Sequence, residues 1–165
     1  MTVNITVENE KEDVIMAWTD GATRNTGNTA GGSVNEYDKG AYGYYMNFRG
    51  AEKSDVVTNR GCTNNYNEIK AVILLLSALK TNKYPIKIHS DSAYVVNAIN
   101  DGWYKKWRSN GWDKEGGLVN REEWIELIGL IEQFDVQMIK VKGHSNNKYN
   151  NLVDRMLNDA MDIQK

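Results

Sequence analysis

The sequence predicts a single α/β domain, residues 1–165, in which helices pack on a mixed β-sheet. The first observation is the run Val14–Gly21, where both alternating sets of side chains are largely apolar. Such a run is typical of a strand buried on both faces, and we expect it in the middle of the sheet. The second observation is the order of the expected elements: three strands, a helix, a strand, three helices, a strand and a helix. That order favours a mixed sheet covered by helices, and the length is sufficient for one domain with a substantial core.

The other strands are predicted from apolar residues at every second position between turn residues. In the second strand the apolar side chains alternate from Tyr42 to Phe48, so this strand should have one buried face. The four further strands are expected over Ala41–Arg49, Ser54–Asn59, Ile86–Asp91 and Val136–Val141.

The helices are predicted from apolar stripes and capping residues. Ala22–Lys39 is rich in Gly, Asn and Thr and is expected to be a long loop, and residues 1–13 a weakly ordered leader. The helices are expected from Thr63 or Asn64 to about Lys80, over Ser92–Asn100, within Gly102–Trp112, over Arg121–Gln133 and over Asn147–Asp162.

The composition excludes several classes of protein. The longest strongly apolar run, Ala71–Leu76, is far too short to span a bilayer. The N-terminus has neither the basic start nor the apolar core of a secretory signal. Cys62 is the only cysteine, which excludes an internal disulfide and a multi-cysteine zinc site. We therefore expect a cytoplasmic protein that does not enter a membrane.

The charge is unevenly distributed. A net charge of −2 argues against a protein that coats nucleic acid by bulk electrostatics. Two stretches, Gly102–Gly111 and Ile139–Asn151, nevertheless carry basic residues and no acid. Two local basic patches on a protein of net negative charge are typical of a protein that binds a polyanion at defined places.

Two acids stand at the expected ends of strands, Asp20 after the first strand and Asp91 after the fourth. If these strands are parallel neighbours, about 4.8 Å apart, both carboxylates can reach one metal ion. Open α/β sheets place ligand sites at this edge. Taken alone, Asp20 is better explained as the start of a turn, because Asp-Gly is a common turn dipeptide; the three other acids favour the ligand site.

Two further acids, Glu68 and Asp154, are expected beside the apolar stripes of their helices. Each has a plain alternative, as a first-turn acid favoured by the helix dipole or as a solvated helix acid. Four inward acids would repel one another strongly without a cation. Oxygen ligands suit Mg²⁺ or Mn²⁺ better than Zn²⁺, and two such ions roughly 3.5–4 Å apart can clamp a phosphodiester.

These acids belong to a longer series of motifs. The series is Thr19-Asp20-Gly21, Thr63-Asn64-Asn65 with Glu68, Ser90-Asp91-Ser92, then Trp103, Trp107 and Trp112, Asn120, Val141-Lys142-Gly143-His144, and Asn150 with Asp154. In this order, and with the ten-residue step from His144 to Asp154, the chain from about Val14 to Met161 resembles a type 1 ribonuclease H.

The resemblance implies a ribonuclease H-like fold, a five-stranded mixed sheet with strands 1–3 antiparallel and strands 4 and 5 parallel to strand 1. It implies a monomeric, metal-dependent endoribonuclease that hydrolyses the RNA strand of RNA–DNA hybrids by two-metal-ion catalysis and leaves 3′-hydroxyl and 5′-phosphate ends. The cofactor would be two Mg²⁺ ions per site, for which Mn²⁺ substitutes. The same resemblance makes His144 an assistant in proton transfer or product release. It assigns the metal-binding catalytic carboxylates to Asp20, Glu68, Asp91 and Asp154.

A second group of residues is expected to bind the hybrid. Lysine and arginine would contact phosphates, tryptophan rings would lie against sugars or bases, and asparagines would bond 2′-hydroxyls. The alternatives are that the tryptophans pack the core, for which Trp112, Trp18 and Trp124 are the best candidates, and that the asparagines cap helices. His89 is expected to be structural. The expected substrate-binding residues are Asn25, Thr63, Asn64, Asn65, Trp103, Lys105, Lys106, Trp107, Arg108 and Asn120.

Two other functions remain open at this point. A non-catalytic nucleic-acid-binding module would not need the four acids and His144. Another nuclease of the same superfold would not need the basic, tryptophan-rich stretch or the Lys-Gly-His loop.

Overall fold

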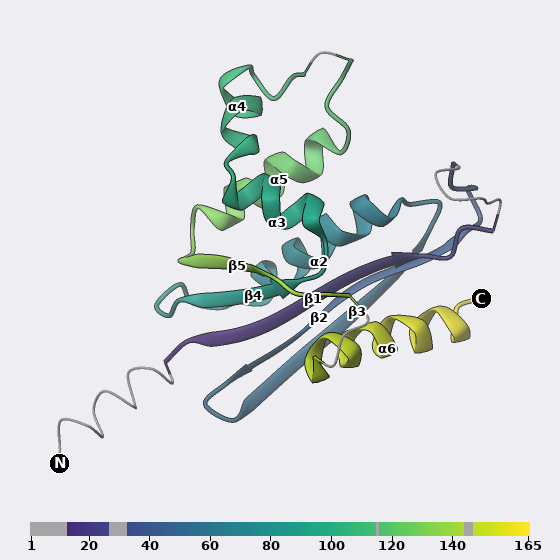
Figure 1. The fold of residues 1–165 in the computed structure, drawn as a ribbon. Coiled ribbons are helices and arrows are strands. Elements are labelled where there is room, and N and C mark those ends of the chain that lie inside the picture. Colours follow the sequence, from purple (N-terminus) through teal and green to yellow (C-terminus); the bar gives the residue numbers. More distant parts are fainter. Residues whose placement is uncertain (1–12, 27–32, 115, 144–146) are drawn as a thin grey trace.

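The computed structural model of the protein describes residues 13–26, 33–114, 116–143 and 147–165. Its centre is a five-stranded sheet in the order β3-β2-β1-β4-β5 (Figure 1). The pairs β1–β2 and β2–β3 are antiparallel, whereas β4 is parallel to β1 and β5 is parallel to β4. The predicted fold class is therefore confirmed. The strands are β1 Ile15–Thr23, β2 Lys39–Phe48, β3 Ala51–Arg60, β4 Ile86–Ser90 and β5 Val136–Lys140.

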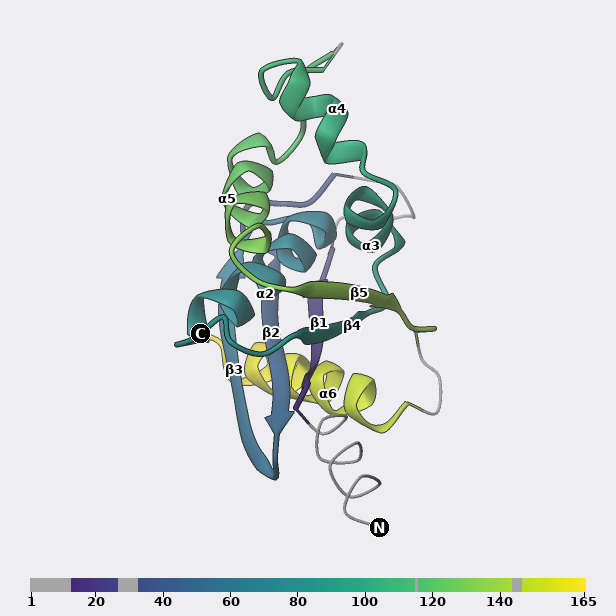
Figure 2. The same ribbon diagram turned by 90° about the vertical axis from the view of Figure 1, so that its left-hand side faces the viewer.

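Helices cover both faces of the sheet. Helices α2, α3 and α5 lie on one face and α6 on the other, while α4 projects beyond α3, away from the sheet (Figure 2). Thr63 caps α2, one of the two caps expected there, and Ser92 and Asn147, expected as first helical residues, are instead the caps of α3 and α6. No helix in the described ranges has the length and apolarity needed to cross a membrane. The helices are α2 Asn64–Ala78, α3 Ala93–Asn100, α4 Trp103–Ser109, α5 Arg121–Ile131 and α6 Lys148–Ile163.

The sheet separates two apolar cores. Ala17 of β1 packs in the core under α2, and its neighbour Trp18 packs in the core under α6, so β1 is buried on both faces as predicted. The expectation of a single buried face for β2 is wrong. Tyr44 lies in the α2-side core and Tyr45 in the α6-side core, because α6 covers the face that the sequence pattern leaves to solvent.

Strand β1 is longer than expected, and this extension shapes the site. Its pairing with β4 ends at Trp18 and His89, whereas its pairing with β2 continues to Thr23 and Gly40. Asp20 therefore lies inside β1, just beyond the last β1–β4 pair, and does not end the strand. The loop expected from Ala22 to Lys39 is shorter than predicted, because Ala22 and Thr23 belong to β1 and Lys39 belongs to β2. Residues 27–32 of this loop and residues 1–12 of the expected leader lie outside the described residues.

Candidate active site

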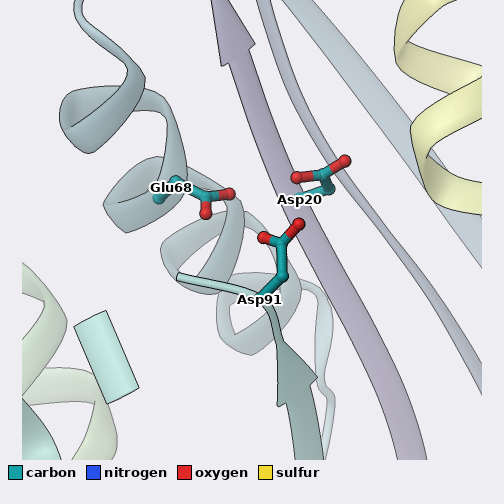
Figure 3. A group of neighbouring side chains, drawn as sticks. All are labelled: Asp20, Glu68 and Asp91. Carbon is teal, nitrogen blue, oxygen red and sulfur yellow. The ribbon is translucent and has the colours of Figure 1, made fainter. Parts of the chain in front are cut away.

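Three acids from three separate parts of the chain meet beside β1, just beyond the point where its pairing with β4 ends. They are Asp20 of β1, Glu68 of α2 and Asp91, which follows β4. One carboxylate oxygen of each lies within 4.8 Å of the others, and the three side chains point toward one another (Figure 3). Asp20 and Glu68 are buried, with exposed fractions of 7% and 8%. The predicted meeting of these acids is present in the structure.

Two glycines allow the elements that carry the acids to approach each other. A Cβ atom on Gly21 would collide with the backbone of Asn67 and Glu68, so only glycine lets α2 touch β1 at this point. A Cβ atom on Gly143 would lie 3.1 Å from a carboxylate oxygen of Asp91. The backbone after β5 therefore passes directly beside the acids.

The acids are electrostatically costly in the absence of a cation. Burial, and then the charges of Asp91 and Asp154, raise the pKa of Asp20 from 3.8 to about 7, although the Gly21 N–H donates to its Oδ1 at 2.9 Å. Burial, and then the charges of Asp20 and Asp91, raise the pKa of Glu68 well above its ordinary value. Oε1 of Glu68 is buried without a hydrogen-bond partner among the described residues. An unpartnered buried oxygen in an all-carboxylate group fits a hard divalent cation.

The three acids line an open cavity of about 500 Å³. Asp154 of α6 lines the same cavity and is half-buried. It lies outside the tight group of three, but its charge is one of the causes of the raised pKa of Asp20. The cavity thus brings together all four predicted carboxylates. His144 lies outside the described residues.

The expected substrate-binding residues on α2 surround this cavity. Thr63 caps α2 by accepting from the Tyr66 N–H at 3.1 Å. Asn64 accepts from the backbone N–H of Thr23 at 2.7 Å, and both Asn64 and Asn65 line the cavity. Thr63 therefore caps α2, and Asn65 is an exposed residue of the cavity lining.

Two further asparagines lie outside the cavity lining. Asn120, before α5, has a left-handed backbone with φ of 59°. Its Nδ2 is buried without a hydrogen-bond partner in the part of the chain that the structure describes. Asn25 is half-buried and follows the end of β1.

Helix α4, residues Trp103–Ser109, carries the basic and aromatic residues, and we call it the handle. Trp103 is 42% exposed, and Lys105 and Lys106 are exposed beside it. Trp107 instead packs against buried Trp124, with ring centroids 5.3 Å apart. Arg108 forms an ion pair with Glu132, the C-cap residue of α5. The handle thus has an outward side and an attached side.

Two contacts attach the handle and its surroundings to the domain. Arg108 donates to Glu132 at 2.7 Å and lies over the ring of Tyr104. Trp112, which follows the handle, is partly buried against the core. The expected core tryptophans, Trp18 and Trp124, are both buried.

His89 and the aromatic residues around it are structural, in agreement with the sequence. The imidazole stacks on Trp18 with centroids 4.6 Å apart, and its Nδ1 lies 2.8 Å from the Ala17 carbonyl oxygen. Tyr149 at the start of α6 packs against the same indole ring. This cluster fixes the start of the helix that carries Asp154.

Two residues beside the site, Asn67 and Tyr94, were not predicted from the sequence. Asn67, adjacent to Glu68, is completely buried and hydrogen-bonded on both sides of its amide. Tyr94 lines the cavity, and its hydroxyl accepts from the indole N–H of Trp124 at 2.8 Å. The signal for Asn67 was present, because a polar residue at an inward helical position needs hydrogen-bond partners.

A family model, the related sequences and the related structures all point to the same family. The family model described as RNase H matches residues 11–162. Ribonuclease H of Clostridium botulinum (strain Hall) is 40% identical over 150 residues, which cover 90% of this chain and 95% of that protein. The crystal structure of LC9-RNase H1, a type 1 RNase H with the type 2 active-site motif, has a TM-score of 0.78 at 20% identity and covers 92% of this chain and 74% of its own. The foamy viral protease-reverse transcriptase in complex with RNA/DNA hybrid has a TM-score of 0.68 at 17% identity, covering 89% of this chain and 20% of its own.

Proposed function

The chain belongs to the ribonuclease H family, and on that premise we propose that it is a metal-dependent endonuclease that hydrolyses the RNA strand of RNA–DNA hybrids. The observation that carries the proposal is the meeting of Asp20, Glu68 and Asp91 at one open cavity. A fold relative solved with a bound RNA/DNA hybrid supports the choice of substrate.

The cofactor in this proposal is Mg²⁺, with two ions per site and Mn²⁺ as a substitute. The all-oxygen ligand set and the unpartnered Oε1 of Glu68 support a hard cation. When bound, such ions would stabilise negative charge at the scissile phosphate and activate the attacking water. The products would carry 3′-hydroxyl and 5′-phosphate ends, as the resemblance implies.

The carboxylates would hold the cations and fix the phosphate between them. Asp20, Glu68 and Asp91 would be the shared inner ligands, and Asp154 would add a ligand from the α6 side of the cavity. His144 would assist proton transfer or product release. Its place in the sequence, one residue after the glycine that touches Asp91, supports this role.

The hybrid would lie across the cavity and reach the handle. Asn64 and Asn65 would contact the RNA minor groove beside the acids, where 2′-hydroxyls distinguish RNA from DNA. Trp103, Lys105 and Lys106 would contact the partner strand from the exposed side of the handle. The remaining proposed contacts are those of Asn25, Thr63, Trp107, Arg108 and Asn120.

The setting that we propose is a monomer in the cytoplasm. The presence of one cysteine in the chain supports a reducing compartment. Size-exclusion chromatography with light scattering would measure the oligomeric state directly.

The experiment that tests this function compares matched substrates of one sequence. A labelled RNA–DNA hybrid, RNA duplex and DNA duplex are incubated with the protein in Mg²⁺ and in EDTA. We expect internal cleavage of the RNA strand of the hybrid, only in Mg²⁺. Equal cleavage of the DNA duplex would indicate another nuclease of this fold, and tight binding without any cleavage would indicate a binding module.

A further inference from the structure

A buried polar network lies directly behind the acids, and Asn67 is its centre. The side chain of Asn67 has no exposed surface. Its Nδ2 donates to the carbonyl oxygen of Ala22 and to Oγ1 of Thr23, both at 3.0 Å. Its Oδ1 accepts from Nδ2 of Asn59 at 2.8 Å. One amide therefore joins α2 to β1 and β3.

The network continues from β1 to the start of α2. Oγ1 of Thr23 donates to the carbonyl oxygen of Cys62 at 2.6 Å. The backbone N–H of Thr23 donates to Oδ1 of Asn64 at 2.7 Å. Thr23 thus connects Asn67 to the segment that precedes α2 and to an asparagine that lines the acid cavity.

Close packing leaves this network no alternative arrangement. The bare Cα of Gly21 allows the backbone of Asn67 and Glu68 to contact β1. A Cβ atom on Gly40 would lie 2.7 Å from the amide nitrogen of Asn67. Gly21 therefore lets α2 approach β1, and Gly40 leaves room for the amide group of Asn67.

The network acts where the sheet itself gives least support. Strand β1 has no β4 partner beyond Trp18, so the segment that carries Asp20 is paired with β2 alone, and α2 packs on one face of it at Gly21. Repulsion between the carboxylates of Asp20 and Glu68 pushes α2 away from β1. The hydrogen bonds of Asn67 oppose that repulsion one residue from Glu68.

We propose that Asn67 is a positioning residue that holds Glu68 at the metal-binding distance from Asp20 and, through Thr23, holds Asn64 at the cavity. The residue acts on the cation and the hybrid only through these neighbours. The inference rests on the proposed function of the acid cavity. It adds to the four carboxylates a buried residue, Asn67, that fixes the position of one of them.

The test measures Mn²⁺ binding by isothermal titration calorimetry, without any substrate. Asn67→Ala removes the amide group and every hydrogen bond that it makes, and adds no atom to the close-packed site. Partners that orient metal ligands typically contribute 10–100-fold in metal affinity. We therefore expect Asn67→Ala to weaken Mn²⁺ binding by about tenfold, and to weaken hybrid binding in Ca²⁺ because Asn64 loses its anchor.

A matched control separates positioning from general stability. Leu76→Ala removes buried apolar volume from α2, two turns away from Glu68, and touches no part of the network. It should lower the melting temperature at least as much as Asn67→Ala does, yet leave Mn²⁺ affinity within about twofold of the original protein. Equal loss of Mn²⁺ affinity in both variants would overturn the proposal.

A second variant covers the case in which Asn67→Ala does not fold. Thr23→Val keeps the shape of the side chain and removes the hydroxyl that links Asn67 to Cys62. We expect a smaller loss of Mn²⁺ affinity in the same direction, and unchanged affinity would contradict the inference. Failure of the original protein to cleave hybrids while it binds Mn²⁺ would count against the proposed function alone, whereas failure to bind Mn²⁺ would reject both.

Discussion

The acid cavity and the handle carry opposite charges and are built in opposite ways. In the cavity, three acids from β1, α2 and the end of β4 meet within 4.8 Å, and two of them are buried. In the handle, one short helix presents its basic residues to solvent and contains no buried residue. The cavity depends on the whole fold, whereas the handle is attached mainly by Trp107 and Arg108.

This difference separates two tasks. Phosphodiester chemistry needs ligands held in fixed positions, because small displacements of reacting groups cost large factors in rate. Attraction of a polyanion needs exposed positive charge, and tolerates mobile side chains. Substitutions in the cavity should therefore change rate and metal binding, and substitutions in the handle should change affinity and its salt dependence.

The largest effect is expected for Asp91→Asn. Loss of one of the carboxylates that we propose as metal ligands should lower the single-turnover rate in Mg²⁺ by at least about a thousandfold. The melting temperature of the metal-free protein should stay equal or rise, because the charge of Asp91 raises the pKa of both Asp20 and Glu68. Calorimetry measures this stability, and fluorescence anisotropy in Ca²⁺ should show that hybrid binding survives.

Asp101→Asn is the matched control for that variant. Asp101 is an exposed aspartate at the C-cap of α3 and does not line the acid cavity. Its cleavage rate should stay within about twofold of the original protein. Cleavage by Asp91→Asn within tenfold of the original rate would remove Asp91 from the catalytic group.

The cavity was largely predictable because its parts are local patterns. The buried run that ends near Asp20 predicted a central strand. An acid beside the apolar stripe of α2 made an inward Glu68 one of two explanations, and the resemblance to type 1 ribonuclease H decided between them. Both patterns depend on residues within a few positions of each other. The meeting of the acids then followed from the parallel arrangement of β1 and β4.

The features that sequence reasoning missed depend on contacts between distant residues. The second buried face of β2 exists because α6, more than a hundred residues later, packs on it. The hydrogen bonds of Asn67 to Asn59 and Thr23 require three elements to be placed first. Arg108 looked like a free cation of the handle, but its partner Glu132 lies beyond α5.

The next effect is a pH-dependent change in the stability of the metal-free protein. Asp20 has a pKa of about 7 in the fold and 3.8 as its ordinary value, so the folded state binds a proton that the unfolded state has released. The free energy of unfolding should therefore fall as pH rises from about 4 to about 7, and level off above that range. Thermal unfolding in EDTA between pH 5 and pH 8 measures this trend.

Mg²⁺ should reverse the trend at the alkaline end. Ionised carboxylates bind the cation, and a concentration 100 times the dissociation constant stabilises the fold by about 2.7 kcal/mol. For a chain of this length that corresponds to roughly 5–10 °C at pH 8, with a smaller rise at pH 5. The control is Asp20→Asn, in which the fall with pH should weaken. A metal-free stability that increases from pH 5 to pH 8 would contradict the electrostatic description of the cavity.

The smallest effect is expected in the handle. Lys105 and Lys106 are exposed, so replacing both by alanine should reduce the slope of log affinity against log salt by about 1 for each lysine, because each loses one phosphate contact. Arg108→Ala should change the slope less, because Glu132 already neutralises its charge. Hybrid binding in Ca²⁺ between 50 and 200 mM salt measures both slopes.

A double replacement of Lys80 and Lys83 controls for the loss of two charges. Both lysines follow α2, outside the handle and the acid cavity, and should leave the slope unchanged. If the Lys105 and Lys106 variant kept the original slope, the handle would make no phosphate contact, and affinity would have to come from the cavity side alone. A large slope change for Arg108→Ala would instead mean that the hybrid displaces Glu132 from the guanidinium group, and the attached side of the handle would then belong to the binding surface.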